Sequence, residues 1–143
     1  MDLALGQSAA GHGAAPIKDV TTASFEVDVI AASMEAPVIV DFWAPWCGPC
    51  KQLAPFLEKT VRATNGAVRM FKLNVDENPE IAKLMRIQSI PAVYAFKDGQ
   101  PVDGFVGALP EDQIEQFVRN LLIKDVTTAT FLRRSSTVRS ILR

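Results

Sequence analysis

The sequence predicts an α/β domain in which helices flank a central mixed sheet, giving a three-layer sandwich. Residues 38–43 form a mostly apolar run of the kind found in strands buried on both faces. Residues 51–64 follow with apolar side chains at helical spacing. Strand and helix patterns then alternate until two strands meet at a tight turn. This order predicts a βαβ half followed by a ββα half.

The first half of the domain contains a short strand, a helix, the buried strand and a long helix. These elements are expected at residues 17–21, 25–34, 38–43 and 51–64. Thr22 or Ser24 is a suitable cap for the first helix. Pro37 breaks the chain before the buried strand. Pro55 lies inside the long helix, where proline removes a backbone hydrogen bond and favours a kink. Asn65-Gly66 ends that helix.

The second half contains a strand, a short helix, a hairpin and a final helix. These elements are expected at residues 68–76, 79–85, 92–97, 102–106 and 110–122. Asn78 caps the short helix, and Pro79 occupies its first position, where no N–H is needed. Asp98-Gly99 forms the hairpin turn. Pro110 opens the last helix, with acidic residues in its first turn.

Cys47 and Cys50 are the only cysteines, and they lie where the buried strand gives way to the long helix. The free N–H groups and positive dipole end of a helix favour an anion, so the first cysteine should ionise readily. The second cysteine can then attack a mixed disulfide formed by the first. Two alternatives compete. A zinc site needs four ligands, and His12 is the only other soft candidate. The pair could also be a structural disulfide or two inert core thiols.

The stretch Trp46-Cys47-Gly48-Pro49-Cys50-Lys51, after an apolar strand, resembles the active site of the thioredoxin family. The resemblance covers residues 17–122. It implies the thioredoxin fold and protein disulfide reductase activity by dithiol–disulfide exchange, without a cofactor of the chain's own. It also implies disulfide-containing protein substrates and re-reduction by a flavin-dependent thioredoxin reductase. In this family, the Gly-Pro dipeptide accompanies reductases.

The resemblance assigns catalytic roles to Cys47, Cys50, Asp41 and Lys72. Cys47 is the expected nucleophile at an exposed helix start, and Cys50 is the shielded resolving thiol. Asp41 lies within an apolar strand, so burial should raise its pKa and let it accept the proton of the resolving thiol. Lys72 matches the family lysine that neighbours this aspartate. From the residues alone, Asp41 could equally reach solvent at a strand end, and Lys72 could be a surface lysine.

The resemblance also implies a substrate-binding surface around the cysteines. The Ile90–Pro91 peptide bond is expected to be cis, because the family's Ile-Pro bond is cis. Gly107 matches a glycine on the substrate-facing surface, where the lack of a side chain lets a partner approach. The residues expected to bind substrate are Trp46, Gly48, Pro49, Ile90, Pro91 and Gly107.

Composition limits the other functions open to the chain. It has 143 residues, of which 48% are hydrophobic and 22% charged, with a net charge of −1. This balance gives no overall electrostatic case for binding nucleic acid or an anionic membrane. Residues 1–16 are expected to be a flexible leader and do not resemble a secretory signal. A close cysteine pair without a signal favours the cytoplasm.

The C-terminal tail, residues 123–143, is basic and repeats an earlier segment. Residues 124–143 carry five cationic side chains and one acid, a net charge of +4. Eight of the nine residues at 123–131 are identical to those at 17–25. The second copy could compete for the place of the first strand, in the same or another molecule. It could instead be a basic arm that binds a partner, or a rearranged chain end without function.

A second functional class remains open. The body of the chain also resembles the N-terminal thioredoxin domain of bacterial co-chaperones, and the Ala-rich leader and residues 19–25 favour that likeness. The alternative function is therefore a co-chaperone module that binds unfolded or oxidised client proteins.

Overall fold

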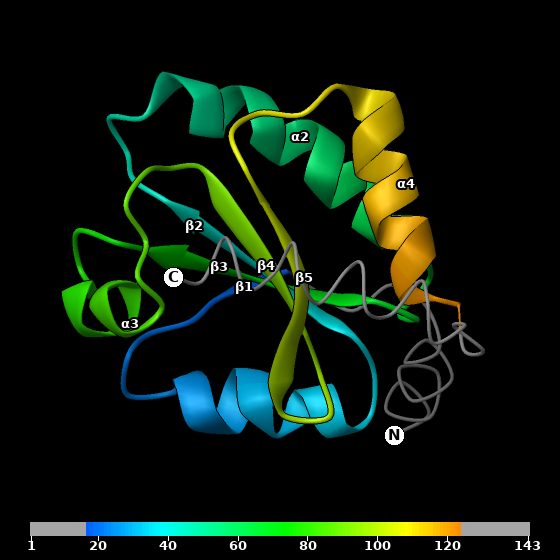
Figure 1. Cartoon of the computed structure of the whole chain (residues 1–143), viewed down its shortest axis with the longest axis horizontal. Coiled ribbons are helices and arrows are strands. Elements are labelled where there is room, and N and C mark those ends of the chain that lie inside the picture. The colour runs from blue at the N-terminus through cyan, green and yellow to red at the C-terminus, as the bar shows by residue number, and fades with distance from the viewer. Residues whose placement is uncertain (1–16, 124–143) are drawn as a thin grey trace, which may run out of the picture.

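The computed structural model describes residues 17–123. Five strands form one mixed sheet in the order β1-β3-β2-β4-β5, with helices on both faces (Figure 1). The elements are β1 Lys18–Asp19, η1 Glu26–Ile30, η2 Ala32–Met34, β2 Val38–Trp43, α2 Gly48–Arg62, β3 Arg69–Asn74, α3 Pro79–Leu84, β4 Ala92–Lys97, β5 Gln100–Val106 and α4 Glu111–Leu121. The expected leader and all but the first residue of the expected tail lie outside the described residues.

Strand β2 is the centre of the sheet and carries the chain to the cysteines. It pairs in parallel with β3 and antiparallel with β4, while β1 extends the parallel side and β5 the antiparallel side. Five of its six residues are buried, because helices cover both faces of this strand. The expected three-layer α/β sandwich with a mixed sheet is confirmed.

Two apolar cores lie on opposite faces of the sheet. Helices α2 and α4 cover one face, where Leu57 and Ile114 are fully buried against Ile39 of β2. Helices η1 and α3 lie on the other face, where Val29 and Ile81 pack with the β2 residues Val38, Val40 and Phe42. Alternating residues of one strand thus enter different cores, as the pleat of a strand requires.

The helix expected at 25–34 forms as two short pieces. Residues Glu26–Ile30 make a π-helix, in which the Ala31 N–H donates to the Glu26 carbonyl, and a 3-10 turn follows. The buried Ser33 explains the tightened end. Its Oγ donates to the Ile30 carbonyl at 2.6 Å and accepts the Gly99 N–H at 2.9 Å. A serine that bonds back to its own helix while holding a distant turn bends the helix away from regular geometry.

The hairpin between β4 and β5 matches the prediction, with β5 starting two residues earlier than expected. Asp98 and Gly99 both have positive φ, 54° and 81°, as a type I′ turn requires.

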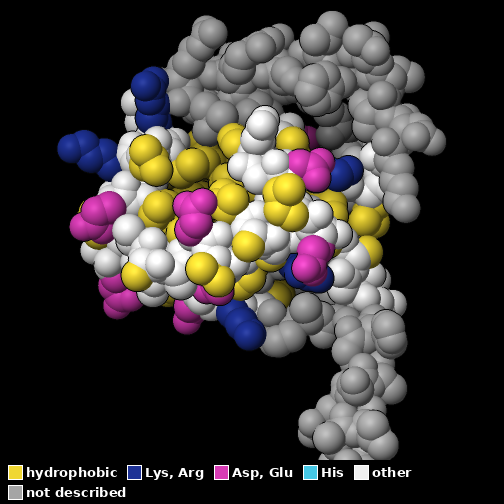
Figure 2. All heavy atoms as spheres, turned by 90° about the horizontal axis from the view of Figure 1, so that it is seen from below, with side chains coloured by type: hydrophobic (Ala, Val, Ile, Leu, Met, Phe, Trp, Pro, Cys, Tyr) yellow, Lys and Arg dark blue, Asp and Glu magenta, His cyan; other side chains and the backbone are white. Residues whose placement is uncertain are grey.

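On the face containing η1 and α3, charged side chains of both signs are scattered among hydrophobic ones (Figure 2). The described part of that face therefore shows no continuous basic field.

Candidate functional site

The cysteine pair is held at the N-terminus of α2. Cys47 caps this helix with an extended backbone, and Gly48 and Pro49 make its first turn. The two cysteines form a disulfide with their Cα atoms 5.3 Å apart. The backbone N–H of Cys50 donates to the Cys47 sulfur at 3.2 Å. A thiolate at Cys47 would thus face a backbone donor and the positive end of the helix dipole, both of which lower a thiol pKa.

The expected difference in exposure between the cysteines is wrong for the oxidised protein. Cys47 is 3% exposed and Cys50 is 2% exposed. Both sulfurs lie in a small cluster with Ala44, against which Val75 and Ile90 pack. What distinguishes the two cysteines is therefore position in the helix, since Cys47 is the cap and Cys50 lies within the first turn.

Ile90 packs against the cysteine cluster, and the next residue, Pro91, is hydrogen-bonded to Gly107. The Ile90–Pro91 peptide bond is cis, as expected. The Pro91 carbonyl accepts the Gly107 N–H at 2.8 Å, which ties the loop before β4 to the end of β5. Gly107 has a φ of 93°, and no atom lies within 4 Å of where its Cβ would be. This corner is open to an approaching backbone.

Trp46 forms the rim of the site and is 68% exposed. Its indole N–H donates to the Asp76 carboxylate at 2.9 Å, and the Asp76 N–H is held by the Asn74 side chain at 2.9 Å. Beside the indole lies an open groove of about 620 Å³, lined mainly by Trp46, helix α3 and the loop ending at Ile90. Sequence reasoning missed Asp76, although an Asn-x-Asp pattern after a strand is typical of a side-chain-held turn.

Asp41 lies in the middle of β2, the strand that leads to the cysteines, and it is 1% exposed. Neither carboxylate oxygen has a hydrogen-bond partner. Loss of solvation raises the pKa of Asp41 from 3.8 to about 7, opposed by the charge of Lys72 and reinforced by that of Glu58. The expected burial and raised pKa of this carboxyl are confirmed, and the alternative in which it reaches solvent is wrong.

Lys72 lies opposite Asp41 in the β2–β3 register, but its ammonium group pairs elsewhere. The Lys72 Nζ donates to a Glu58 oxygen at 3.0 Å and lies 5.4 Å from the centre of the Trp43 ring. Glu58 also contacts Arg62 at 3.6 Å. Sequence reasoning missed Glu58. Its spacing of eight residues from Cys50, about two helical turns, was the available signal, because such residues share a face.

The described residues contain no group of three or more potential metal ligands, and no helix among them is long and apolar enough to cross a membrane. His12, the remaining soft zinc ligand considered from the sequence, lies outside the described residues.

Comparison with known proteins places this geometry in context. A family model described as Thioredoxin matches residues 16–120. The chain is 48% identical over 92 residues to "Thioredoxin 1" of Synechococcus elongatus, covering 64% of this chain and 84% of the relative. It is 46% identical over 103 residues to "Thioredoxin" of Synechocystis, covering 72% and 94% respectively. It is 44% identical over 102 residues to "Thioredoxin" of Rhodospirillum rubrum, covering 71% and 96%.

Proposed function

Because the chain belongs to the thioredoxin family, we propose that it reduces protein disulfides with Cys47 as the attacking thiolate and Cys50 as the resolving thiol. It is a protein disulfide oxidoreductase that acts by dithiol–disulfide exchange on disulfide-containing substrates. The observation that supports the residue roles best is the pairing of the two cysteines at the start of α2, with Cys47 as the helix cap.

The reaction moves two electrons from the dithiol to the substrate. The Cys47 thiolate attacks one sulfur of the substrate disulfide, forming a mixed disulfide and releasing the other sulfur as a thiolate. Cys50 then loses its proton and attacks the Cys47 sulfur. The second substrate sulfur leaves, and the Cys47–Cys50 disulfide remains. Each released substrate thiolate takes up a proton, so the substrate leaves as a dithiol.

Asp41 is the proposed proton acceptor for Cys50. Its pKa of about 7 keeps the carboxyl partly ionised near neutral pH, which suits a group that gains and loses a proton in each cycle. Its oxygens make no competing hydrogen bond. The proposed role of Lys72 is electrostatic, because its charge lowers the pKa of Asp41 while its ammonium group is held by Glu58.

The proposed substrate surface surrounds the disulfide. The open groove beside Trp46 gives an apolar surface for a substrate segment, and Ile90 lies at its edge. Gly107 leaves space for the substrate backbone next to Pro91. Gly48 and Pro49 form the first turn of α2, and no atom lies within 4 Å of where a Cβ on Gly48 would be. A substrate sulfur can therefore approach over this turn.

The proposed source of electrons is a flavin-dependent thioredoxin reductase, and the proposed compartment is the cytoplasm. Reduction of insulin in the presence of NADPH and a bacterial thioredoxin reductase tests both the activity and the partner. The parent chain should turn over, and Cys47→Ser should not. If dithiothreitol supports turnover but the reductase does not, the disulfide chemistry stands and the partner is wrong.

A co-chaperone role is the second candidate, and the same open groove beside Trp46 favours it because clients could bind there without disulfide exchange. The double variant Cys47→Ser/Cys50→Ser separates the two functions. Suppression of the aggregation of a cysteine-free client by this variant would support client binding independent of redox chemistry. If the variant has no effect on aggregation, the groove serves disulfide substrates only.

A further inference from the structure

The repeated segment gives the chain two copies of the sequence that occupies the first strand. Residues 17–25 are described by the structure and are repeated at 123–131, of which only Ile123 lies within the described residues. We call the surface that receives residues 18–25 the β1 slot. Its walls are β3, the start of α3 and the apolar core beneath η1.

Two apolar side chains of the first copy enter this slot. Val20 is 2% exposed, and its N–H donates to the Lys72 carbonyl at 2.9 Å, extending the parallel pairing of β1 with β3. Phe25 is 7% exposed and meets the Phe96 ring edge-on, with the ring centres 5.7 Å apart. The second copy has the same valine and phenylalanine at the same spacing.

The first copy also makes hydrogen bonds, and the residues that form them recur in the second copy. The Thr22 N–H donates to the side chain of the buried Asn78 at 2.9 Å, and the Thr22 hydroxyl donates to Glu80 at 3.3 Å. The Thr21 N–H and hydroxyl both donate to the Ser24 hydroxyl, at 3.1 and 3.2 Å. The single difference between the copies replaces Ser24 by threonine, which keeps the hydroxyl.

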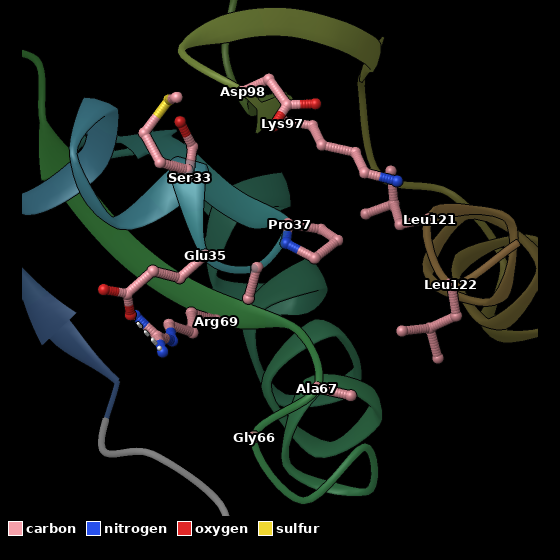
Figure 3. Close-up of a pocket in the computed structure, with 12 residues that line it drawn as sticks. Ser33, Glu35, Pro37, Gly66, Ala67, Arg69, Lys97, Asp98, Leu121 and Leu122 are labelled. Atoms are coloured by element: carbon pink, nitrogen blue, oxygen red, sulfur yellow. Dashed lines mark hydrogen bonds and ion pairs between the residues drawn. The ribbon is translucent and has the colours of Figure 1, made fainter. Parts of the chain in front are cut away.

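The second copy is badly placed to enter the slot of its own molecule. It begins at Ile123, whose N–H still bonds to Asn120 at the end of α4, so no spacer separates helix and repeat. Leu121 is 5% exposed and anchors that helix end in the core. In Figure 3, Leu121 and Leu122 line one side of a pocket of about 470 Å³, and β1 lies beyond Glu35 and Arg69 on the other side. Only two residues, Leu122 and Ile123, separate the end of α4 from Lys124, the counterpart of Lys18, and two residues span at most about 7 Å, so the second copy has little free chain with which to reach the slot of its own molecule.

We propose that residues 124–131 of one molecule occupy the β1 slot of a second copy of this chain, replacing residues 18–25 there. The slot lies at the edge of the sheet, where strand exchange leaves the other strand pairs intact. The exchange ends at Phe25, next to η1, which stays anchored through the fully buried Val29. Because the two copies are so similar, the protein concentration and any substitution in the first copy decide which copy occupies the β1 slot.

The test disables each copy separately in the full-length chain. Val20→Asp places a charge in the apolar slot and disables the first copy, and Val126→Asp does the same to the second. Val126→Asp should melt like the parent. Val20→Asp should remain folded as a dimer or larger assembly by light scattering, with a melting temperature that rises with protein concentration. The double variant should be monomeric and should melt at least about 8 °C lower than Val20→Asp.

Identical melting temperatures and sizes for Val20→Asp and the double variant would overturn the proposal, and so would a Val20→Asp chain that fails to fold. A milder pair, Phe25→Ala with and without Phe131→Ala, must show the same dependence on the second copy. A synthetic peptide of residues 123–131 gives a direct measurement. It should bind the double variant and restore its melting temperature, whereas the same peptide with Val126→Asp should do neither. Insulin reduction by the parent chain is independent of this outcome.

Discussion

Replacing Asp41 by asparagine should remove a large part of the pH dependence of folding stability. In the unfolded chain this carboxyl has its ordinary pKa of 3.8, whereas burial raises it to about 7 in the folded protein. Between these values the folded state keeps a proton that the unfolded state has released. Stability therefore falls as pH rises through this window and levels off above it. The contribution lost by high pH is about 4 kcal/mol, at about 1.4 kcal/mol for each pH unit of the window.

Urea denaturation of the oxidised protein at about pH 5 and about pH 9 measures the part of this loss that lies above pH 5, about 3 kcal/mol. The parent should lose that amount between the two conditions, and Asp41→Asn should lose correspondingly less. Asp112→Asn changes an exposed carboxyl at the start of α4 and is the matched control, which should behave like the parent. Equal losses in the parent and in Asp41→Asn would refute the reasoning, because the buried carboxyl would then be ionised in the folded protein throughout.

Three further predictions concern the chemistry and the chain end. Cys47→Ser should abolish insulin reduction, whereas Cys50→Ser should accumulate a mixed disulfide visible by non-reducing electrophoresis; normal product release by the second variant would reverse the assigned roles. Glu58→Gln removes a negative charge near Asp41 and frees the Lys72 ammonium group from its ion pair, so the pKa of Asp41 should fall. The pH–rate profile of disulfide reduction should then move to lower pH, and an unchanged profile would contradict this role of Glu58. Deleting residues 124–143 should change the melting temperature of the otherwise unaltered chain by less than about 5 °C and leave insulin reduction intact; a larger drop would mean that the second copy supports the folded monomer.

Sequence reasoning worked best where local chemistry dictates the local backbone. The mostly apolar run at 38–43 became β2 with the same bounds, because a strand covered on both faces favours apolar residues at successive positions. Asp98-Gly99 became the expected turn, because both residues tolerate positive φ. The cysteines appeared at the start of α2, since Pro49 is favoured in the first turn of a helix.

Sequence reasoning failed where distant residues decide the outcome. The helix expected at 25–34 is distorted because Ser33 holds Gly99, 66 residues away. Cys47 is covered although it caps a helix, because Val75 and Ile90 pack over it from other segments. The partner of Lys72 is Glu58 on α2 and not the carboxyl opposite it in the sheet. Of these contacts, only the one with Glu58 left a local signal, its helical spacing from Cys50.

The cover over the disulfide also has a consequence for biosynthesis. Of the side chains that pack against the cysteine pair, Trp43 precedes it, whereas Val75 and Ile90 follow Cys50 by 25 and 40 positions. At about 5–20 residues per second, the ribosome adds Ile90 roughly 2 to 8 seconds after Cys50. The nascent chain therefore carries two reactive thiols before two of the residues that shelter them have been made. During that interval, protection from unwanted oxidation depends on the reducing power of the surroundings and not on the protein's own fold.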